Sequence, residues 1–369
     1  MTQSVKVPFL DLRLREDAGA VRDAIARVAA SGWYILGPEV DAFESEFAAA
    51  SGGQFAIGTG NGTDAIALLL RAAGIAAGDE VIVPAITAAY TALAVVAAGA
   101  TPVIVDVDDD TLTMDPAACA AAVGTRTAAI VPVHLYGQAA DMPALTTIAS
   151  RHNLAIVEDC CQAHLATWRG SAVGTSGIGG AFSFYPTKNL GALGDGGAVV
   201  TNDRAVSERI KRLRNGGQSD RYVHAEAGVN SRLDELQAAI LRARLPFLRE
   251  WTRRRRELAA QYRRLLPETV RPIAVRDPGH VYHLFPVRTP GREALQAAMT
   301  AAGIELLIHY PMPLHEQPAF APYRAHECPV ATRAARELLS LPLHPGLADS
   351  DVETVVSAVR HMDRRDVLA

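Results

Sequence analysis

Several features that mark other classes of protein are missing from this sequence. It has 4 cysteines among 369 residues and no C-x-x-C pair, so we expect neither a disulfide framework nor a zinc or other metal site, and a reducing cytoplasm fits best. Its most hydrophobic stretch, Ala88 to Val105, is broken by Gly99 and Pro102, so we expect no membrane span. The amino-terminal residues lack the apolar core of a secretory signal.

The charge of the chain argues against two kinds of partner. The formal net charge at pH 7 is −4, which gives no electrostatic reason to expect binding to nucleic acid or to an anionic membrane. The one dense basic cluster is Arg253-Arg254-Arg255-Arg256. It lies in a stretch with a helical pattern, and we expect it to form a solvated helix face.

What the sequence does contain is an alternation of short β-rich runs with alanine-rich helical stretches such as Asp64–Ala73 and Met142–His152. This alternation predicts an α/β fold in which helices cover both faces of a mostly parallel sheet. Pro132 cannot donate to a sheet, so it marks an edge or a bulge. The predicted strands are Phe55–Gly58, Glu80–Pro84, Val103–Val107, Ala128–Leu135, Leu154–Asp159, Ala181–Tyr185 and Ala198–Thr201.

The length of the chain is enough for two domains. From Ser231 to about Leu265 the pattern is helical and charged, and prolines then interrupt it. We therefore predict a large domain over residues 1–245, including an amino-terminal arm, and a smaller α/β domain over residues 246–369. In the smaller domain we expect strands at His280–Val287 and Ile304–His309, and helices at Arg292–Ala302, near Ala331–Leu339, and at Asp349–Met362.

Lys188 follows the predicted strand Ala181–Tyr185 and precedes a glycine-rich turn. The carboxylate of Asp159 ends another predicted strand, and parallel strands place such ends at one edge of the sheet. A lysine amine, a strand-end acid and a hydroxyl that can bind phosphate, here Ser183, are the groups that pyridoxal phosphate (PLP) requires. Taken singly, Lys188 would be a lysine whose amine reaches solvent, and Asp159 a helix cap.

The roles follow from the chemistry of this cofactor. Lys188 would bind its aldehyde covalently and then move a proton between substrate and cofactor carbons. Asp159 would keep the pyridine nitrogen protonated, and Gln162 could hydrogen-bond the ring hydroxyl. Gly62 and Thr63 lie where the strand Phe55–Gly58 gives way to a helix. Free amides there can bind a phosphate, although the same residues also make a good turn and helix cap.

A series of motifs, in order along nearly the whole chain, resembles the DegT/StrS family of PLP-dependent sugar aminotransferases, which have fold type I of aspartate aminotransferase. The motifs are Ser31-Gly32-Trp33-Tyr34-Ile35-Leu36-Gly37-Pro38-Glu39-Val40, His134-Leu135-Tyr136-Gly137-Gln138, Glu158-Asp159-Cys160-Cys161-Gln162-Ala163-His164, Ser183–Lys188, Asn230-Ser231-Arg232-Leu233-Asp234-Glu235-Leu236-Gln237-Ala238 and His309-Tyr310-Pro311. The similarity implies a homodimer whose sites lie at the interface.

The resemblance implies the same roles for Lys188, Asp159 and Gln162, and makes Gly62, Thr63 and Ser183 phosphate ligands. It also implies that Asn230 reaches the phosphate in the second subunit, and that His309 and Tyr310 line the substrate side. Two positions depart from the family pattern. Ala88 stands where many relatives have an aromatic that stacks on the ring, which leaves open whether Tyr90 replaces it. Cys160-Cys161 stands where many have Ala-Ala, and Cys161 shares a strand face with Asp159.

The resemblance implies a ping-pong transamination. L-glutamate or L-glutamine would give its amino group to a keto group of a nucleotide-linked deoxysugar, most plausibly a dTDP-3-keto-6-deoxyhexose, in amino-sugar biosynthesis for an antibiotic. A 4-keto sugar or a ketocyclitol of the scyllo-inosose type stays open. Lys188 argues against a sugar dehydratase, whose relatives have histidine there. A nicotinamide-dependent dehydrogenase lacks support because no G-x-G-x-x-G is present. A non-catalytic regulatory protein with this fold is the rival from another class.

Overall fold

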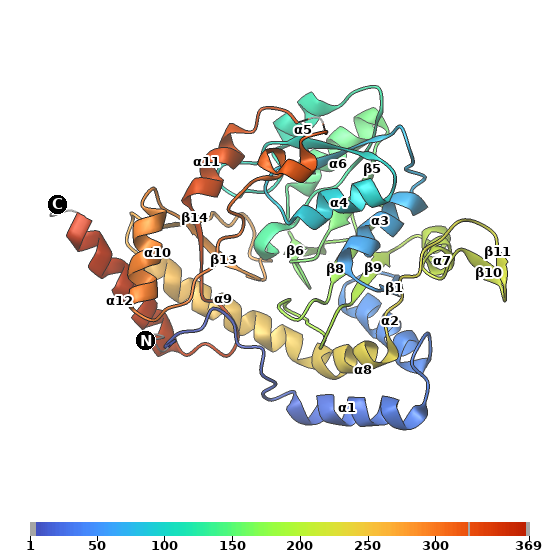
Figure 1. Ribbon diagram of the computed structural model, residues 1–369, viewed down its shortest axis with the longest axis horizontal. Coiled ribbons are helices and arrows are strands. Elements are labelled where there is room, and N and C mark those ends of the chain that lie inside the picture. Colours follow the sequence, from blue (N-terminus) through green and yellow to red (C-terminus); the bar gives the residue numbers. More distant parts are fainter. Residues whose placement is uncertain (1–4, 324, 367–369) are drawn as a thin grey trace.

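A seven-stranded sheet forms the centre of the molecule (Figure 1), and the computed structural model describes residues 5–323 and 325–366. The strand order is β1-β9-β8-β5-β4-β2-β3. Only β9 runs antiparallel to its neighbours, which confirms the mostly parallel sheet predicted from the sequence. The strands are β1 (Phe55–Thr59), β2 (Glu80–Pro84), β3 (Thr101–Val105), β4 (Thr127–Ile130), β5 (Ala155–Asp159), β8 (Gly179–Ser183) and β9 (Gly197–Thr201).

Helices cover both faces of this sheet, so its strands are buried on two sides. In β2, Val81 and Val83 face one hydrophobic cluster and Ile82 faces another, as expected when successive side chains alternate between faces. The helices of this part are α1 (Ala18–Ser31), α2 (Pro38–Ala50), α3 (Gly62–Ala72), α4 (Ala89–Ala97), α5 (Pro116–Ala122), α6 (Met142–His152), α7 (Arg204–Leu213) and α8 (Glu235–Arg244).

Strand β4 ends earlier than predicted, at Ile130 instead of Leu135. Pro132 is the reason: it has no N–H to donate, although its carbonyl accepts a hydrogen bond of 2.9 Å from the amide of Asp159. The chain then turns through a short 3-10 helix, Leu135–Gly137. Pro132 therefore marks the end of a central strand, neither an edge nor a bulge.

The carboxyl-terminal part forms a second, smaller sheet of three antiparallel strands, β12 (Arg271–Pro272), β13 (Phe285–Arg288) and β14 (Leu338–Leu341). A long helix, α9 (Leu248–Leu265), leads into it from α8 through the 3-10 turn Leu245–Phe247. Further helices are α10 (Arg292–Ala301), α11 (Pro329–Glu337) and α12 (Asp349–Asp366), and α10 and α12 pack against each other.

Three predictions in this part were wrong in detail. The strand expected at His280–Val287 begins only at Phe285, because Tyr282 turns the chain with φ of 47°. The segment Ile304–His309 makes isolated bridges to Val7 and Ser340 instead of a regular strand. The helix expected to reach Leu339 stops at Glu337, where the apolar residues of β14 begin.

The amino-terminal arm packs against the carboxyl-terminal part of the chain. Val7 pairs with Ile304, its carbonyl accepts from the amide of Glu305 at 3.0 Å, and the amide of Phe9 donates to the Glu305 carboxylate at 3.0 Å. In Figure 1 the blue arm accordingly runs beside the red and orange elements before it reaches α1. The arm is thus an element of the carboxyl-terminal core in packing, although it belongs to the large domain in sequence.

The basic cluster on α9 differs from the expected solvated face. Arg253 and Arg256 are exposed, and Arg253 pairs with Glu250 and Glu257. Arg255, however, is only 4% exposed. One side of α9 packs into the carboxyl-terminal core through Leu258 and Tyr262, so one arginine in the run of four must face inward.

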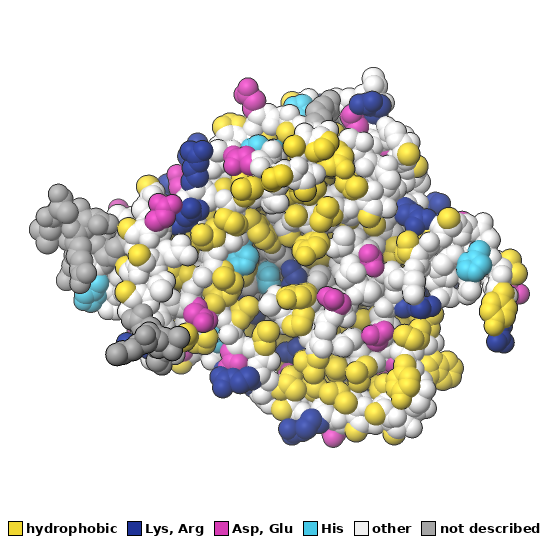
Figure 2. All heavy atoms as spheres, viewed as in Figure 1, with side chains coloured by type: hydrophobic (Ala, Val, Ile, Leu, Met, Phe, Trp, Pro, Cys, Tyr) yellow, Lys and Arg dark blue, Asp and Glu magenta, His cyan; other side chains and the backbone are white. Residues whose placement is uncertain are grey.

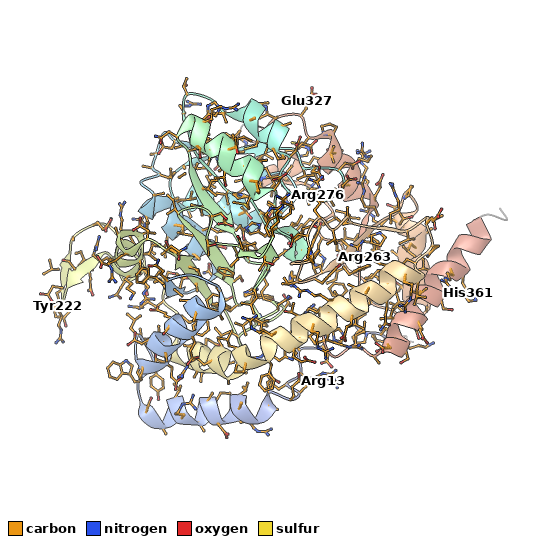
Figure 3. All side chains as sticks on the ribbon, turned by 180° about the vertical axis from the view of Figure 1, so that it is seen from behind. Arg13, Tyr222, Arg263, Arg276, Glu327 and His361 are labelled. Atoms are coloured by element: carbon orange, nitrogen blue, oxygen red, sulfur yellow. The ribbon has the colours of Figure 1, made fainter. Side chains whose placement is uncertain are left out.

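A narrow hairpin, β10 (Gln218–Asp220) and β11 (Val223–His224), projects from the body near α7 (Figures 1 and 3). Tyr222 at its tip is 78% exposed, and Val223 is 55% exposed. A second short antiparallel pair is formed by β6 (Thr167–Trp168) and β7 (Ser171–Ala172). Among the described helices, none is long and apolar enough to cross a membrane.

Candidate active site

Lys188 lies in a tight turn just beyond the end of β8. Its amide donates a hydrogen bond of 2.8 Å to the carbonyl of Tyr185, and the residue is half-buried. Burial lowers the pKa of the Lys188 amine below its ordinary value, although the neighbouring Cys161 and Asp159 oppose this shift. A larger share of the amine is therefore neutral, and so nucleophilic, than in an exposed lysine.

Asp159 is buried, 5% exposed, at the end of β5. Its Oδ1 accepts from the amide of Cys161 at 3.0 Å, and its Oδ2 accepts from the hydroxyl of Thr91 at 2.7 Å. Thr91 in turn lies 2.9 Å, oxygen to oxygen, from Thr87. Since the single proton of Thr91 is directed at the carboxylate, Thr87 is the donor to Thr91. These bonds fix the plane of the carboxylate.

Gln162 connects the large sheet to the carboxyl-terminal part. Its Oε1 accepts from the amide of Tyr136 at 2.7 Å, and its Nε2 donates to the hydroxyl of Tyr310 at 2.8 Å. Tyr136 donates its own hydroxyl to the carbonyl of His309 at 2.5 Å. The structure thus brings the predicted residues Gln162, His309 and Tyr310 together. The ring of His309 stacks on Phe9 of the amino-terminal arm, with centroids 5.8 Å apart.

Gly62, Ser183 and Cys161 meet at the start of α3. A Cβ atom built on Gly62 would lie 2.7 Å from the sulfur of Cys161 and 2.8 Å from Cβ of Ser183, so only glycine fits there. The side chain of Asn61 caps the amide of Asp64 at 2.9 Å. The amides of Gly62 and Thr63 lie in the first helical turn, where backbone N–H groups have no partner within the helix and can bind an anion.

Asn230 precedes Ser231, whose hydroxyl bonds Gly60 and Asp64 on either side of Gly62. It is exposed and pairs with Asn215 in an isolated antiparallel bridge, beyond the β10–β11 hairpin. The resemblance assigned this residue to the site of a second subunit, and an exposed position at the base of a projecting hairpin agrees with a residue that acts outside its own chain.

Three histidines surround Lys188. Burial, followed by the positive charge of Lys188, lowers the pKa of His164 to about 3 and that of His309 to about 4. The same two causes lower the pKa of His283 well below its usual range. All three rings are therefore neutral at neutral pH, so they add no positive charge near the lysine.

Sequence reasoning missed Asn189, His283 and Thr91. The Nδ2 of Asn189 donates to the carbonyl of Val281 at 3.1 Å, and its Oδ1 therefore accepts from Nδ1 of His283 at 3.2 Å. The proton of the neutral His283 ring is therefore on Nδ1, and Nε2 has a free lone pair. The adjacency of Asn189 to Lys188 was a signal for the first residue. His283 and Thr91 had none, because their contacts span about 90 and 70 residues of chain.

The two departures from the family pattern fall on either side of this site. Ala88 precedes α4 and is half-buried, while Tyr90 is 65% exposed. Cys161 sits in the cradle under Gly62, and Cys160 packs on the opposite side of the strand against Gly174 and Gly180. The two adjacent cysteines therefore face different environments, and all 4 cysteines are free thiols.

These groups fit PLP. The cradle at Gly62 matches its phosphate, the carboxylate of Asp159 matches its pyridine nitrogen, and Lys188 offers an amine of lowered pKa to its aldehyde. Figure 2 shows a hollow at the centre of the front face, with histidine and basic side chains at its bottom.

The family model for the DegT/DnrJ/EryC1/StrS aminotransferases matches residues 16–360. The chain belongs to this family. The aminotransferase is 48% identical to "dTDP-3-amino-3,4,6-trideoxy-alpha-D-glucose transaminase" of Streptomyces venezuelae, over 98% of each chain. It is 47% identical to "dTDP-3-amino-3,6-dideoxy-alpha-D-galactopyranose transaminase" of Aneurinibacillus thermoaerophilus, over 96% of this chain and 98% of the other.

Solved structures agree with this assignment. The crystal structure of S. venezuelae DesV in complex with a ketimine intermediate superposes on the aminotransferase with a TM-score of 0.94 at 48% identity, covering 97% of this chain and 98% of that one. The members of the family and the structural neighbours are PLP-dependent enzymes. The fold predicted from the sequence, a PLP-dependent transferase of type I, is therefore confirmed.

Proposed function

We propose that this aminotransferase binds PLP and moves an amino group from L-glutamate or L-glutamine to the keto group of a dTDP-3-keto-6-deoxyhexose. The observation that carries the proposal is the set of Lys188, Asp159 and the Gly62 cradle at one edge of the sheet. The sugar is chosen because the two relatives described above are named for dTDP-linked 3-amino sugars. No specific observation favours a 4-keto sugar or a ketocyclitol.

PLP bound at this site would supply an electron sink for the negative charge that develops when a proton leaves the substrate carbon. The residues of the chain bind the cofactor and move the proton. Lys188 holds the cofactor and then carries the proton at Nζ, which its lowered pKa favours. Asp159, fixed by Thr91 and the Cys161 amide, keeps an anion against the ring nitrogen. Gly62, Thr63 and Ser183 bind the phosphate.

On the substrate side, the hydrogen bond from Gln162 orients the Tyr310 hydroxyl, and the stacking of His309 on Phe9 holds the His309 ring. The amide nitrogen of Gln162 already donates to Tyr310. The contact between Gln162 and the ring hydroxyl that was predicted from the sequence must therefore use the other N–H of the same nitrogen. We propose that Tyr310 and Gln162 form one hydrogen-bonded unit beside the cofactor ring.

The working unit is a homodimer in this proposal. Asn230 is exposed in its own chain, and the hairpin before it presents Tyr222 and Val223 to solvent. Trp33 and Tyr34, at 56% and 57% exposure, add further apolar surface on the same protomer. Aromatic side chains are enriched in protein interfaces relative to the rest of the surface. A second copy would cover them and receive Asn230 at its phosphate site.

Two further expectations complete the proposal. The chain divides into domains at residues 1–245 and 246–369, and the Leu245–Phe247 turn between α8 and α9 supports this position. The protein resides in the cytoplasm, where its 4 free thiols would stay reduced.

The test is a substrate panel with the purified protein. With L-glutamate or L-glutamine as donor, dTDP-3-keto-6-deoxyhexoses, 4-keto isomers and ketocyclitols are offered as acceptors, and the carbon that carries the new amine is identified by NMR. We expect amination at C3 of the dTDP sugar. In parallel, Lys188→Ala should lose both turnover and the visible absorbance of the lysine-bound cofactor. Failure of every acceptor with a fully loaded protein would favour the regulatory rival instead.

A further inference from the structure

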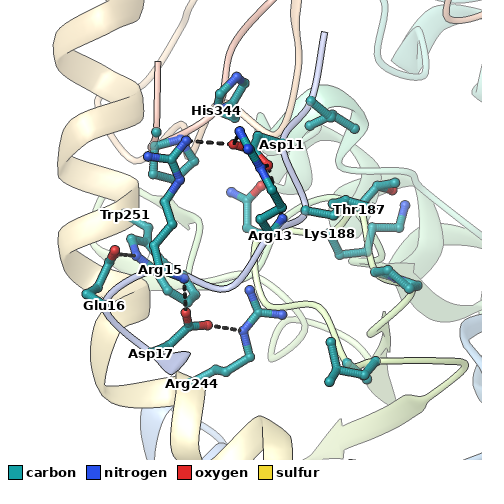
Figure 4. Close-up of a pocket in the computed structure, with 18 of the residues that line it drawn as sticks. Asp11, Arg13, Arg15, Glu16, Asp17, Thr187, Lys188, Arg244, Trp251 and His344 are labelled. Atoms are coloured by element: carbon teal, nitrogen blue, oxygen red, sulfur yellow. Dashed lines mark hydrogen bonds and ion pairs between the residues drawn. The ribbon is translucent and has the colours of Figure 1, made fainter. Parts of the chain in front are cut away.

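A cavity of about 220 Å³ opens beside the Lys188 turn (Figure 4). Four separate segments form its walls: residues 10–17 of the amino-terminal arm, residues 186–193, the α8–α9 region, and residues 344–346. Because the walls come from parts of the chain far apart in sequence, the folded protein forms the cavity only when arm, large sheet and carboxyl-terminal part are all in place.

Positive charge exceeds negative charge on the walls of this cavity. Its lining includes Arg13, Arg15, Lys188, Arg244 and Arg255 as cations, and Asp11, Glu16 and Asp17 as anions. The anions already have partners, as the dashed lines of Figure 4 show. Asp11 accepts from both Arg13 and Arg15, Asp17 accepts from Arg244, and Glu16 accepts from the indole of Trp251.

Among the arginines of these walls, Arg255 is the one that these anions do not reach in the described part of the chain. It is 4% exposed, and its Nη1 donates to the carbonyls of Leu343, Tyr282 and His283 at 2.8, 3.2 and 3.3 Å. Among the described residues, its Nε has no hydrogen-bond partner. Burial lowers the pKa of Arg255 to about 10, so the group is still cationic at neutral pH.

A buried guanidinium held only by carbonyl dipoles is an unfavourable arrangement, because removing a charge from water costs more than neutral partners return. The unpartnered Nε leaves donor capacity in this guanidinium, and a carboxylate is one of the anions that accept two parallel bonds from such a group. The neighbouring His344 supplies no competing charge, since burial lowers its pKa to about 4.

We propose that this cavity is an anion subsite in which Arg255 binds a carboxylate of the amino donor while the donor nitrogen faces the Lys188 turn. The inference rests on the proposed aminotransferase function and assigns part of its donor site. A diphosphate of the nucleotide sugar has related chemistry, but ligand pockets for molecules of that size usually exceed about 300 Å³. The cavity volume therefore favours the small carboxylate.

The test measures binding without turnover. Glutarate, which has both carboxylates of glutamate and no amine, and dTDP are titrated separately into the PLP-loaded protein by calorimetry. The variants are Arg255→Met, Arg255→Lys and the matched control Arg253→Met, which removes an exposed arginine from the same helix. We expect glutarate to bind at least about tenfold more weakly to Arg255→Met, as for a lost charged hydrogen bond, with an intermediate loss in Arg255→Lys and no change in the control.

The affinity for dTDP separates this role from a merely structural one, since loss of the carbonyl contacts of Arg255 would disturb both ligands. Equal weakening of glutarate and dTDP, or loss of dTDP alone, would overturn the proposal. So would unchanged glutarate affinity in Arg255→Met. If Arg255→Met does not fold, the comparison of Arg255→Lys with wild type decides. Because glutarate needs no acceptor sugar, its binding can succeed even if the aminotransfer reaction fails, and the reverse also holds.

Discussion

The hydroxyl of Thr91 donates a hydrogen bond of 2.7 Å to Oδ2 of Asp159, although 68 residues of chain separate them. Thr91 lies in the first turn of α4 and is 1% exposed, so water cannot substitute for it. The hydroxyl chain from Thr87 through Thr91 engages Oδ2 of this carboxylate, and the amide of Cys161 engages Oδ1, so both oxygens are held in place.

Replacing Thr91 by valine should therefore weaken cofactor retention, because valine keeps the shape but cannot donate to Asp159. We expect the dissociation constant for PLP to rise about fivefold to tenfold, as for the loss of one buried hydrogen bond to a charged group. Equilibrium dialysis measures this directly. Thr91→Ser is the matched control and should bind PLP nearly as wild type; equal weakening in both variants would contradict the role of the hydroxyl.

Gly62→Ala should block the phosphate cradle. The added methyl would lie 2.7 Å from the sulfur of Cys161 and 2.8 Å from Cβ of Ser183, so one of these side chains must move. We expect PLP affinity to fall by at least about tenfold, as when an anion site at a helix start is distorted. Gly19→Ala is the control, since nothing lies within 4 Å of the added atom; it should leave PLP binding unchanged.

Stability should fall with acid because of buried neutral histidines. The pKa of His164 is about 3 when folded, against about 6.5 when unfolded. Between these values the unfolded chain binds the extra proton, so the free energy of unfolding decreases by about 1.4 kcal/mol per pH unit for this residue as pH falls below 6.5. Urea unfolding of the wild type and of His164→Phe at pH 7.5, 6 and 5 would show it. The variant should have the shallower dependence; parallel curves would be contrary evidence.

Mixing of subunits tests whether Asn230 serves the second protomer. Lys188→Ala and Asn230→Ala would each be nearly inactive alone if every site needs Lys188 from one chain and Asn230 from its partner. Unfolded and refolded together in equal amounts, they should regain about a quarter of wild-type activity, because half of the dimers then contain one intact site. Recovery of no activity, with mixed dimers shown by mass spectrometry, would place Asn230 outside the partner's site.

Much of the fold could be read from the sequence because the sheet is buried on both faces. Strand β2 was placed at its observed bounds, Glu80–Pro84, and helix α6 at Met142–His152, since continuous apolar strands and amphipathic helices have distinct patterns. The segment His280–Leu284 gave a similar apolar signal but is not a strand. Its shape depends on hydrogen bonds to Gly137 and Arg255, which no local pattern reveals.

The sequence predicts those site residues whose chemical type and position next to a strand can both be read from one short segment. Lys188, Asp159 and Gly62 each follow or precede a strand, so strand prediction alone brought them to one edge. Thr91 and Arg255 could not be found in this way. Each is one polar residue on a helix, and only the packing of that helix decides whether the side chain reaches solvent, a carboxylate or a cavity.

The pairing of Phe9 with Glu305 spans 296 residues. During synthesis the arm, which is partly apolar, therefore stays without this partner until nearly the whole polypeptide has been made. Contacts so distant in sequence form late and slowly. Docking of the arm would then be among the last events of maturation, and a nascent chain interrupted before residue 305 could assemble its large sheet yet leave its beginning without a place to bind.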